Sequence, residues 1–273
     1  MIKVYLKQAW ELLKQNKLFS MLYIVGTGLA IAMTMVMAMV YYVKIAPVYP
    51  EVNRLNTLYL TSCKMESGTE GNKSQYQWAV SYKALQEWFY PTKNALCVSA
   101  QLDDRAFQNS YIQSADLSGD FPVKVKLTDP DFFRIYRFHF LEGSPFTASD
   151  LASGLCTAVI TDELSRRLFG TTEGVVGRSF RLDYTDYRVC GVIRSGSYLM
   201  RNSYSQVYLP YSVVSGYREP KYDMDYLGAF SVTFQVKDGE QGDALRAELK
   251  EIARKENLMH PDEWKVEFWE QPA

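Results

Sequence analysis

The hydrophobic pattern of this sequence is dominated by one run, residues 18–43, that holds no charged side chain. As an α-helix the run would be roughly 39 Å long at about 1.5 Å rise per residue. That length exceeds the roughly 30 Å hydrocarbon core of a bilayer, so the run predicts a transmembrane helix that crosses with some tilt. Gly26 and Ala30 stand four residues apart within it, and small-residue pairs of this spacing let another helix pack closely.

Residues 1–17, before this run, carry apolar side chains at helical spacing with lysines beside them. The pattern predicts a short amphipathic helix on the cytoplasmic side. Two interpretations fit it. The helix lies on the inner leaflet with its lysines near anionic lipid, or it is simply the cytoplasmic start of the transmembrane helix.

After the span, a strand–helix–strand pattern occurs twice, once near each end of the remaining sequence. Alternation with a period of two indicates strands, and apolar residues three and four apart indicate helices. The first unit has a strand over 55–60, a helix over 78–90 and a strand over 95–100; the second has a strand over 230–236, a helix over 243–256 and a strand over 264–269. Two β-α-β units would pair into one α/β subdomain, over 47–106 and 225–273.

The stretch between these units, residues 107–224, is rich in short strands. They are predicted at 123–127, 179–182 and 187–193, and one short helix at 162–169 interrupts them. We therefore expect a β-rich subdomain inserted into a discontinuous α/β subdomain. The predicted fold class is α+β: one N-terminal transmembrane helix, followed by this two-part extracytoplasmic domain.

The charges beside the span predict its orientation. Lys3, Lys7, Lys14 and Lys17 precede it against the single acidic Glu11, whereas Lys44, Glu51 and Arg54 follow it. By the positive-inside rule the N-terminus is cytoplasmic, and the main domain is periplasmic or otherwise extracytoplasmic, on the cell inner membrane. A cleaved signal peptide is the rival interpretation, but the run is long for a signal core and bulky residues 41–44 make a poor cleavage site.

The overall composition excludes further functions. The chain has 30 Lys and Arg against 31 Asp and Glu, a net charge of −1, so we expect no binding of nucleic acid. Cys63, Cys97, Cys156 and Cys190 all fall on the proposed outer side, where disulfides are permitted. Their wide spacing resembles neither a zinc site nor a dense disulfide scaffold, and we expect buried, free thiols.

Catalytic chemistry is not expected in this chain either. The two histidines, His139 and His260, do not suggest a metal cluster or a triad, and no Gly-x-Ser-x-Gly elbow occurs. The run GVVGRS (174–179) superficially resembles a phosphate loop but lacks its earlier glycine and its lysine. The sequence thus predicts no catalytic, cofactor-binding or metal-binding residue, no cofactor, and no ATP hydrolysis by this chain.

Seven short motifs follow one another in an order that resembles the periplasmic core domain of MacB-like and FtsX-like ABC transporter permeases. They are DFF (131–133), LEGSPF (141–146), AVITDEL (158–164), LFG (168–170), VGRSFRL (176–182), YRVCGVI (187–193) and VYLP (207–210). Residues 16–20, NKLFS, also resemble the segment that leads into the first span of such permeases. The resemblance extends from residue 1 to about 270, with departures at Ser144-Pro145 and at Cys190.

The motif positions that we single out are Phe133, Gly143, Phe146, Phe169, Gly170, Gly177, Gly191 and Pro210. The glycines also have physical interpretations of their own. Gly170 follows the short helix, where a left-handed cap is expected, and Gly143 and Gly177 stand at strand starts, where turns need unusual backbone angles. Gly191 inside a strand suggests a bulge or a close backbone approach. We interpret all of these residues as fold-defining rather than chemical.

The resemblance implies a function. In such permeases an ABC ATPase subunit drives motion through the membrane, a second permease copy completes a dimer, and the outer domains act mechanically on a substrate or on a periplasmic or outer-membrane partner. The α/β (porter-like) subdomain would be the relay and the β-rich (sabre-like) insert the contact surface. Such permeases carry three further spans, so the chain resembles their N-terminal part. The alternatives are a single-pass receptor or adaptor with an extracytoplasmic ligand-binding domain, and a membrane-anchored hydrolase.

Overall fold

The computed structural model describes residues 2–67, 74–113, 120–220, 225–261 and 264–271. The chain divides into two compact units, Met1–Ala46 and Pro47–Ala273. Each unit is described by itself below, and the second is called the outer domain.

The first unit consists of two helices, α1 (Ile2–Gln15) and α2 (Lys17–Ile45), that meet at Asn16. By its length and composition α2 can cross a membrane, and none of its residues is buried within the chain. The predicted span over 18–43 therefore lies wholly inside α2. A side chain at Gly26 would meet nothing within 4 Å, so the surface around Gly26 and Ala30 is open, and a helix contact there stays a prediction.

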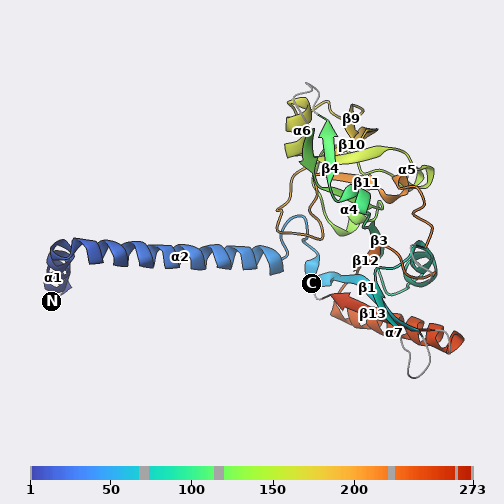
Figure 1. Cartoon of the computed structure of the whole chain (residues 1–273), viewed down its shortest axis with the longest axis horizontal. Coiled ribbons are helices and arrows are strands. Elements are labelled where there is room, and N and C mark those ends of the chain that lie inside the picture. Colours follow the sequence, from blue (N-terminus) through green and yellow to red (C-terminus); the bar gives the residue numbers. More distant parts are fainter. Residues whose placement is uncertain (1, 68–73, 114–119, 221–224, 262–263, 272–273) are drawn as a thin grey trace. The chain divides into compact units, whose positions relative to one another are not determined.

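Four strands of the outer domain come from two β-α-β units, and the strands of the two units alternate in the sheet. Their order in the sheet is β13 (Trp264–Gln271), β1 (Thr57–Ser67), β12 (Phe230–Gln235), β3 (Cys97–Leu102). Each neighbouring pair is antiparallel, so β1 runs parallel to β3 and β12 runs parallel to β13. Helix α7 (Gly239–Met259) connects β12 to β13 and packs along β13 (Figure 1). The predicted pairing of two β-α-β units is confirmed.

The connection between β1 and β3 differs from the single helix predicted over 78–90. Residues Ser74–Trp78 form strand β2, which makes a hairpin with β1. The helical part is shorter: α3 (Tyr82–Ala84) continues into a π-helical turn, η2 (Leu85–Phe89). The Ser81 hydroxyl caps α3 by accepting a hydrogen bond from the Ala84 N–H.

The remaining strands extend the sheet on the far side of β3. They follow in the order β6 (Val125–Thr128), β11 (Val207–Pro210), β8 (Thr157–Thr161), β10 (Thr185–Ile193), β9 (Ser179–Leu182), β4 (Ser110–Gln113) and β5 (Asp120–Val123), with β7 (Phe140–Gly143) paired to β10. Helices α4 (Phe132–Ile135), α5 (Ala148–Ser153) and α6 (Asp162–Phe169) accompany them. This part is rich in short strands, as predicted.

The two parts share one sheet, and in this the structure differs from the expectation of separate subdomains. Strand β3 pairs with β6 at Gln101↔Thr128 and Leu102↔Leu127, so β12 and β6 belong to the same sheet. The physical reason is that the edge of β3 not used by β12 has unpaired peptide groups, which the end of β6 satisfies. The boundaries at 106/107 and 224/225 stay predictions; residues 221–224 lie outside the described part.

A buried carboxylate, Asp129, strengthens this junction. It follows β6 and accepts hydrogen bonds from the Ser99 hydroxyl (2.7 Å), the Ala100 N–H (2.7 Å), the Phe132 N–H (3.1 Å) and the Tyr90 hydroxyl (3.2 Å). Burial raises the pKa of Asp129 to about 6, and the hydrogen bonds from Ala100 and Ser99 oppose that rise. One side chain therefore ties β3, α4 and the helical connection together.

The two faces of the sheet carry different cores. Alternate residues point to opposite faces, so Leu58 and Leu60 belong to a large, mostly aliphatic cluster, whereas Tyr59 between them belongs to a second one. The second cluster is aromatic and centres on α4, where Phe132, Phe133, Tyr136, Phe146 and Tyr208 are all buried. The aromatic cluster lies beside the segment that enters the outer domain.

Candidate functional site

The first feature with functional potential is the start of the outer domain, residues 47–56, which we call the entry segment. It contains a buried ion pair: Arg54 donates to Glu51 Oε2 from Nε at 2.9 Å and from Nη2 at 2.6 Å. The two side chains are only 6% and 1% exposed. The Ser203 hydroxyl donates to the other oxygen, Glu51 Oε1, at 2.6 Å. A buried pair of this kind is stable only because both charges are partnered.

Further hydrogen bonds fix the entry segment along its length. The Tyr49 hydroxyl donates to the Arg194 carbonyl at 2.7 Å and accepts from the His139 N–H at 3.3 Å. The Arg137 N–H donates to the Pro50 carbonyl at 3.1 Å. The Tyr49 ring also packs edge-on against Phe138, which borders the aromatic cluster. These contacts tie the entry segment to the loops that precede β7 and follow β10.

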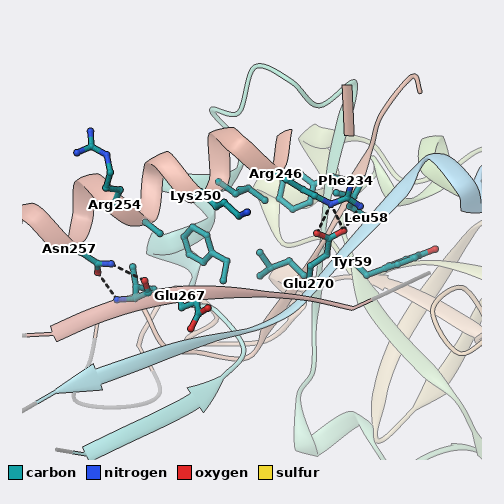
Figure 2. Close-up of a pocket in the computed structure, with 14 residues that line it drawn as sticks. Leu58, Tyr59, Phe234, Arg246, Lys250, Arg254, Asn257, Glu267 and Glu270 are labelled. Atoms are coloured by element: carbon teal, nitrogen blue, oxygen red, sulfur yellow. Dashed lines mark hydrogen bonds and ion pairs between the residues drawn. The ribbon is translucent and has the colours of Figure 1, made fainter. Parts of the chain in front are cut away.

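The second feature is a groove of about 470 Å³ between α7 and strands β1 and β13, drawn in Figure 2. Its apolar lining includes Leu58 and Phe234 from the strands and Leu249 from α7. Polar contacts hold α7 to β13 near both ends of the groove. Arg246 donates to both oxygens of Glu270 (2.8–3.2 Å), and the Asn257 side chain exchanges two hydrogen bonds with the Val266 backbone. The groove offers apolar contact area rather than reactive groups.

The predicted motif residues are found in the packing of the β-rich part. Gly143 and Gly191 are direct partners across β7 and β10. Gly143 has φ +70, and a Cβ there would overlap the Cys190 carbonyl oxygen; a Cβ at Gly191 would lie 2.6 Å from the Ser144 carbonyl oxygen. The structure thus brings together two glycines that lie far apart in the sequence, at a close backbone approach.

The other motif residues are dispersed through the same part of the fold. Gly170 has φ +73 and ends α6, and Gly177 has φ +90 and donates its N–H to the Val189 carbonyl. Phe133 packs edge-on against Phe146, with ring centroids 5.4 Å apart. Phe169 lies under the Arg178 guanidinium, and Pro210 ends β11 opposite Thr128. None of these eight residues lines the groove under α7. Their fold-defining role stays a prediction that this packing supports.

The candidate reactive side chains are dispersed. His139 is exposed and uses its backbone for the hydrogen bonds described above, while the His260 ring stacks on Trp264. Across the parts of the chain that the structure describes, no group of three or more His, Cys, Asp or Glu residues could hold a metal ion. Cys63 and Cys97 are buried and Cys190 is half-buried, as expected, whereas Cys156 is exposed. Burial raises the pKa of the Cys63 thiol to about 12.

Solved structures provide the comparison for the fold. The chain is similar to a domain of a protein described as a permease from Porphyromonas gingivalis, with a TM-score of 0.55, 14% identity, and coverage of 83% of this chain and 92% of that one. It is also similar to the periplasmic region of MacB from Actinobacillus actinomycetemcomitans (TM-score 0.52, 13% identity, 79% and 89% coverage). A third similar structure is the extracellular domain of the ABC-type transporter YknZ from Gram-positive bacteria (0.51, 16%, 78% and 100%).

Sequence comparison agrees with the structural one. A curated relative, the macrolide export ATP-binding/permease protein MacB of Shigella dysenteriae, is 26% identical over 261 residues, which is 93% of this chain. The chain spans only 37% of that relative's length. The family profile described as the MacB-like periplasmic core domain matches residues 20–252. The chain therefore belongs to the MacB-like periplasmic core domain family of ABC transporter permeases.

Proposed function

We propose that this chain acts as the N-terminal part of the permease subunit of a MacB-type ABC transporter and transmits ATPase-driven motion to its outer domain. Family membership supports the transporter assignment. The entry segment carries the mechanical part of the proposal. Its buried Glu51–Arg54 pair and its backbone hydrogen bonds make residues 47–56 a stiff connection rather than a linker.

The arrangement of the sheet supports separate roles for its two parts. The entry segment continues directly into β1, which pairs with both β12 and β13. It is also hydrogen-bonded to Arg194 and Ser203 of the β-rich part, so a displacement would reach both parts. The β-rich, sabre-like part is joined to it through β3 and β6 and through Asp129. We propose that the porter-like part relays motion and that the sabre-like part contacts a substrate or a periplasmic or outer-membrane partner.

The helical unit supports the proposed partners on the membrane side. Residues 18–43 of α2 carry no charge and suit a bilayer, and the small residues Gly26 and Ala30 offer a surface for a second permease copy. Helix α1 exposes Tyr5 and Trp10 beside Lys14, as expected of a helix at a lipid interface near anionic headgroups. We propose that α1 lies next to the ATPase subunit and moves with it.

The proposal is tested by co-expressing the full chain with the MacB-type ATPase of the same genome. We expect the ATPase to be retained on an affinity column that carries this chain. ATP hydrolysis is expected only in samples that contain the ATPase. The chain purified by itself should show no ATP binding by calorimetry. Hydrolysis by the isolated chain would contradict the proposal, and so would failure of every ATPase of that genome to be retained.

The orientation is tested by reporter fusions at Gly216, which is exposed and lies in a turn of the outer domain. With four lysines before the span, we expect alkaline phosphatase, which is active only outside the cytoplasm, to be active at this position. A reporter that functions only in the cytoplasm should give no signal at the same site. The reverse pattern would place the outer domain inside the cell and contradict the proposed topology.

A further inference from the structure

A polar cavity of about 430 Å³ lies between three segments of the outer domain. Strand β6 forms one wall, the turn after β3 (residues 103–108) forms the second, and residues 198–205 form the third. Its volume is within the range of small-ligand sites in proteins. The cavity is distinct from the groove under α7, with which it shares no lining residue.

Three cationic side chains, Lys124, Lys126 and Arg201, line this cavity, together with two carboxylates. Both carboxylates are engaged locally. Asp104 accepts a hydrogen bond from the Ala106 N–H at 2.9 Å, and Asp103 accepts one from the Gln108 side chain at 3.3 Å. The cavity therefore presents more positive than negative charge to a molecule that enters it.

Lys126 is the most informative of the three cations. It is half-buried, and its ammonium donates to Gln101 Oε1 at 2.9 Å, which uses one of its three N–H donors. The nearby carboxylate of Glu51 is already bound to Arg54 and Ser203. Desolvation by burial lowers the pKa of Lys126 to about 8. A poorly solvated ammonium at a cavity wall gains most from an anion placed beside it.

Aromatic groups complete the lining. Phe107, Tyr198 and Tyr204 lie around the cations, with the Lys124 ammonium 5.5 Å from the centre of the Tyr204 ring. Such a combination of a few charged groups with aromatic surface is typical of sites for small organic molecules. From these contacts we propose that the cavity binds a small anion through a carboxylate or phosphate group held by Lys126 and Arg201. The proposal does not depend on the transport function.

The test uses the full chain in phosphatidylcholine nanodiscs, so that no anionic headgroup competes. Citrate serves as the carboxylate probe and inorganic phosphate as the phosphate probe, each titrated by calorimetry. We expect saturable binding of at least one of them, and a loss of affinity of about tenfold or more in Lys126→Gln, since a charge-assisted hydrogen bond is removed. Lys265→Gln, an exposed lysine on β13 outside the cavity, is the matched control and should leave affinity unchanged.

A second variant and a pH series keep the test decisive. Arg201→Gln changes an exposed residue and should weaken binding even where Lys126→Gln does not fold. The charged groups that face Lys126 are Glu51, Asp103 and Lys124. Because Lys126 must be protonated to hold the anion, the affinity for the probe should be greatest below about pH 8 and fall above it. No saturable binding of either probe, or equal weakening in Lys265→Gln, would overturn the proposal.

Discussion

Replacing Gly143 with alanine is expected to lower the free energy of unfolding of the outer domain by about 3 kcal/mol or more. Two costs add at this position. A φ of +70 costs a residue with a Cβ roughly 1–2 kcal/mol. The new Cβ would also overlap the Cys190 carbonyl oxygen, which belongs to the backbone of β10 and cannot move without disturbing that strand. Urea unfolding of the full chain in detergent, followed by tryptophan fluorescence, measures the loss.

Gly170→Ala provides the matched control. Gly170 has nearly the same φ, +73, but a Cβ there would meet nothing within 4 Å. Only the backbone cost remains, so we expect a loss of about 1 kcal/mol. Equal losses in the two variants would contradict the packing role of Gly143 and leave only its conformational freedom.

Removing one partner of the buried pair in the entry segment should be comparably severe. Glu51→Ala leaves the Arg54 guanidinium buried without its carboxylate and the Ser203 hydroxyl without its acceptor. Breaking a buried ion pair from one side typically costs about 3–5 kcal/mol. The double variant Glu51→Leu/Arg54→Met removes both charges and should recover part of that loss. The same urea titration measures all three proteins.

An exposed pair on the β9–β10 hairpin serves as the control for this experiment. Arg181 donates to both oxygens of Asp186, at 2.9 and 3.1 Å, but the two side chains are 51% and 62% exposed. Asp186→Ala should have little effect on unfolding, because exposed pairs contribute little to stability. A double variant that is no more stable than Glu51→Ala would contradict the buried charge of Arg54 as the source of the loss.

Elements with local signals were predictable from the sequence. Helix α6 begins and ends where it was predicted, at Asp162 and Phe169, because the Thr161 side chain caps one end and Gly170 the other. Elements that depend on distant partners were not. Trp78 fits the apolar face of a helix, but it belongs to β2, since β1 supplies a hairpin partner. The strand predicted over 123–127 is divided at Lys124 between β5 and β6.

The candidate site was less accessible to sequence reasoning than the fold. Glu51 and Arg54 stand just after the apolar run, where their charges indicate only the orientation of the span. Their spacing of three is a weak signal of pairing, and Ser203, which completes the site, lies 152 residues away in the sequence. The burial of Lys126 could not be predicted from the sequence either. The alternation of polar and apolar residues over 123–127 places Lys126 with Lys124 on a solvated face, whereas in the structure it is half-buried against Gln101.

The long pairing of β1 with β13 determines how the outer domain responds to force. Their register runs from Tyr59↔Gln271 to Ser67↔Trp264, so the start of the first strand and the end of the last lie at the same corner of the sheet. A pull on both ends in a common direction leaves the hydrogen bonds between them unloaded. A pull that separates the ends instead peels these bonds one at a time, beginning at Tyr59. We therefore expect a force that parts these two strand ends to open the sheet first at the Tyr59↔Gln271 pair.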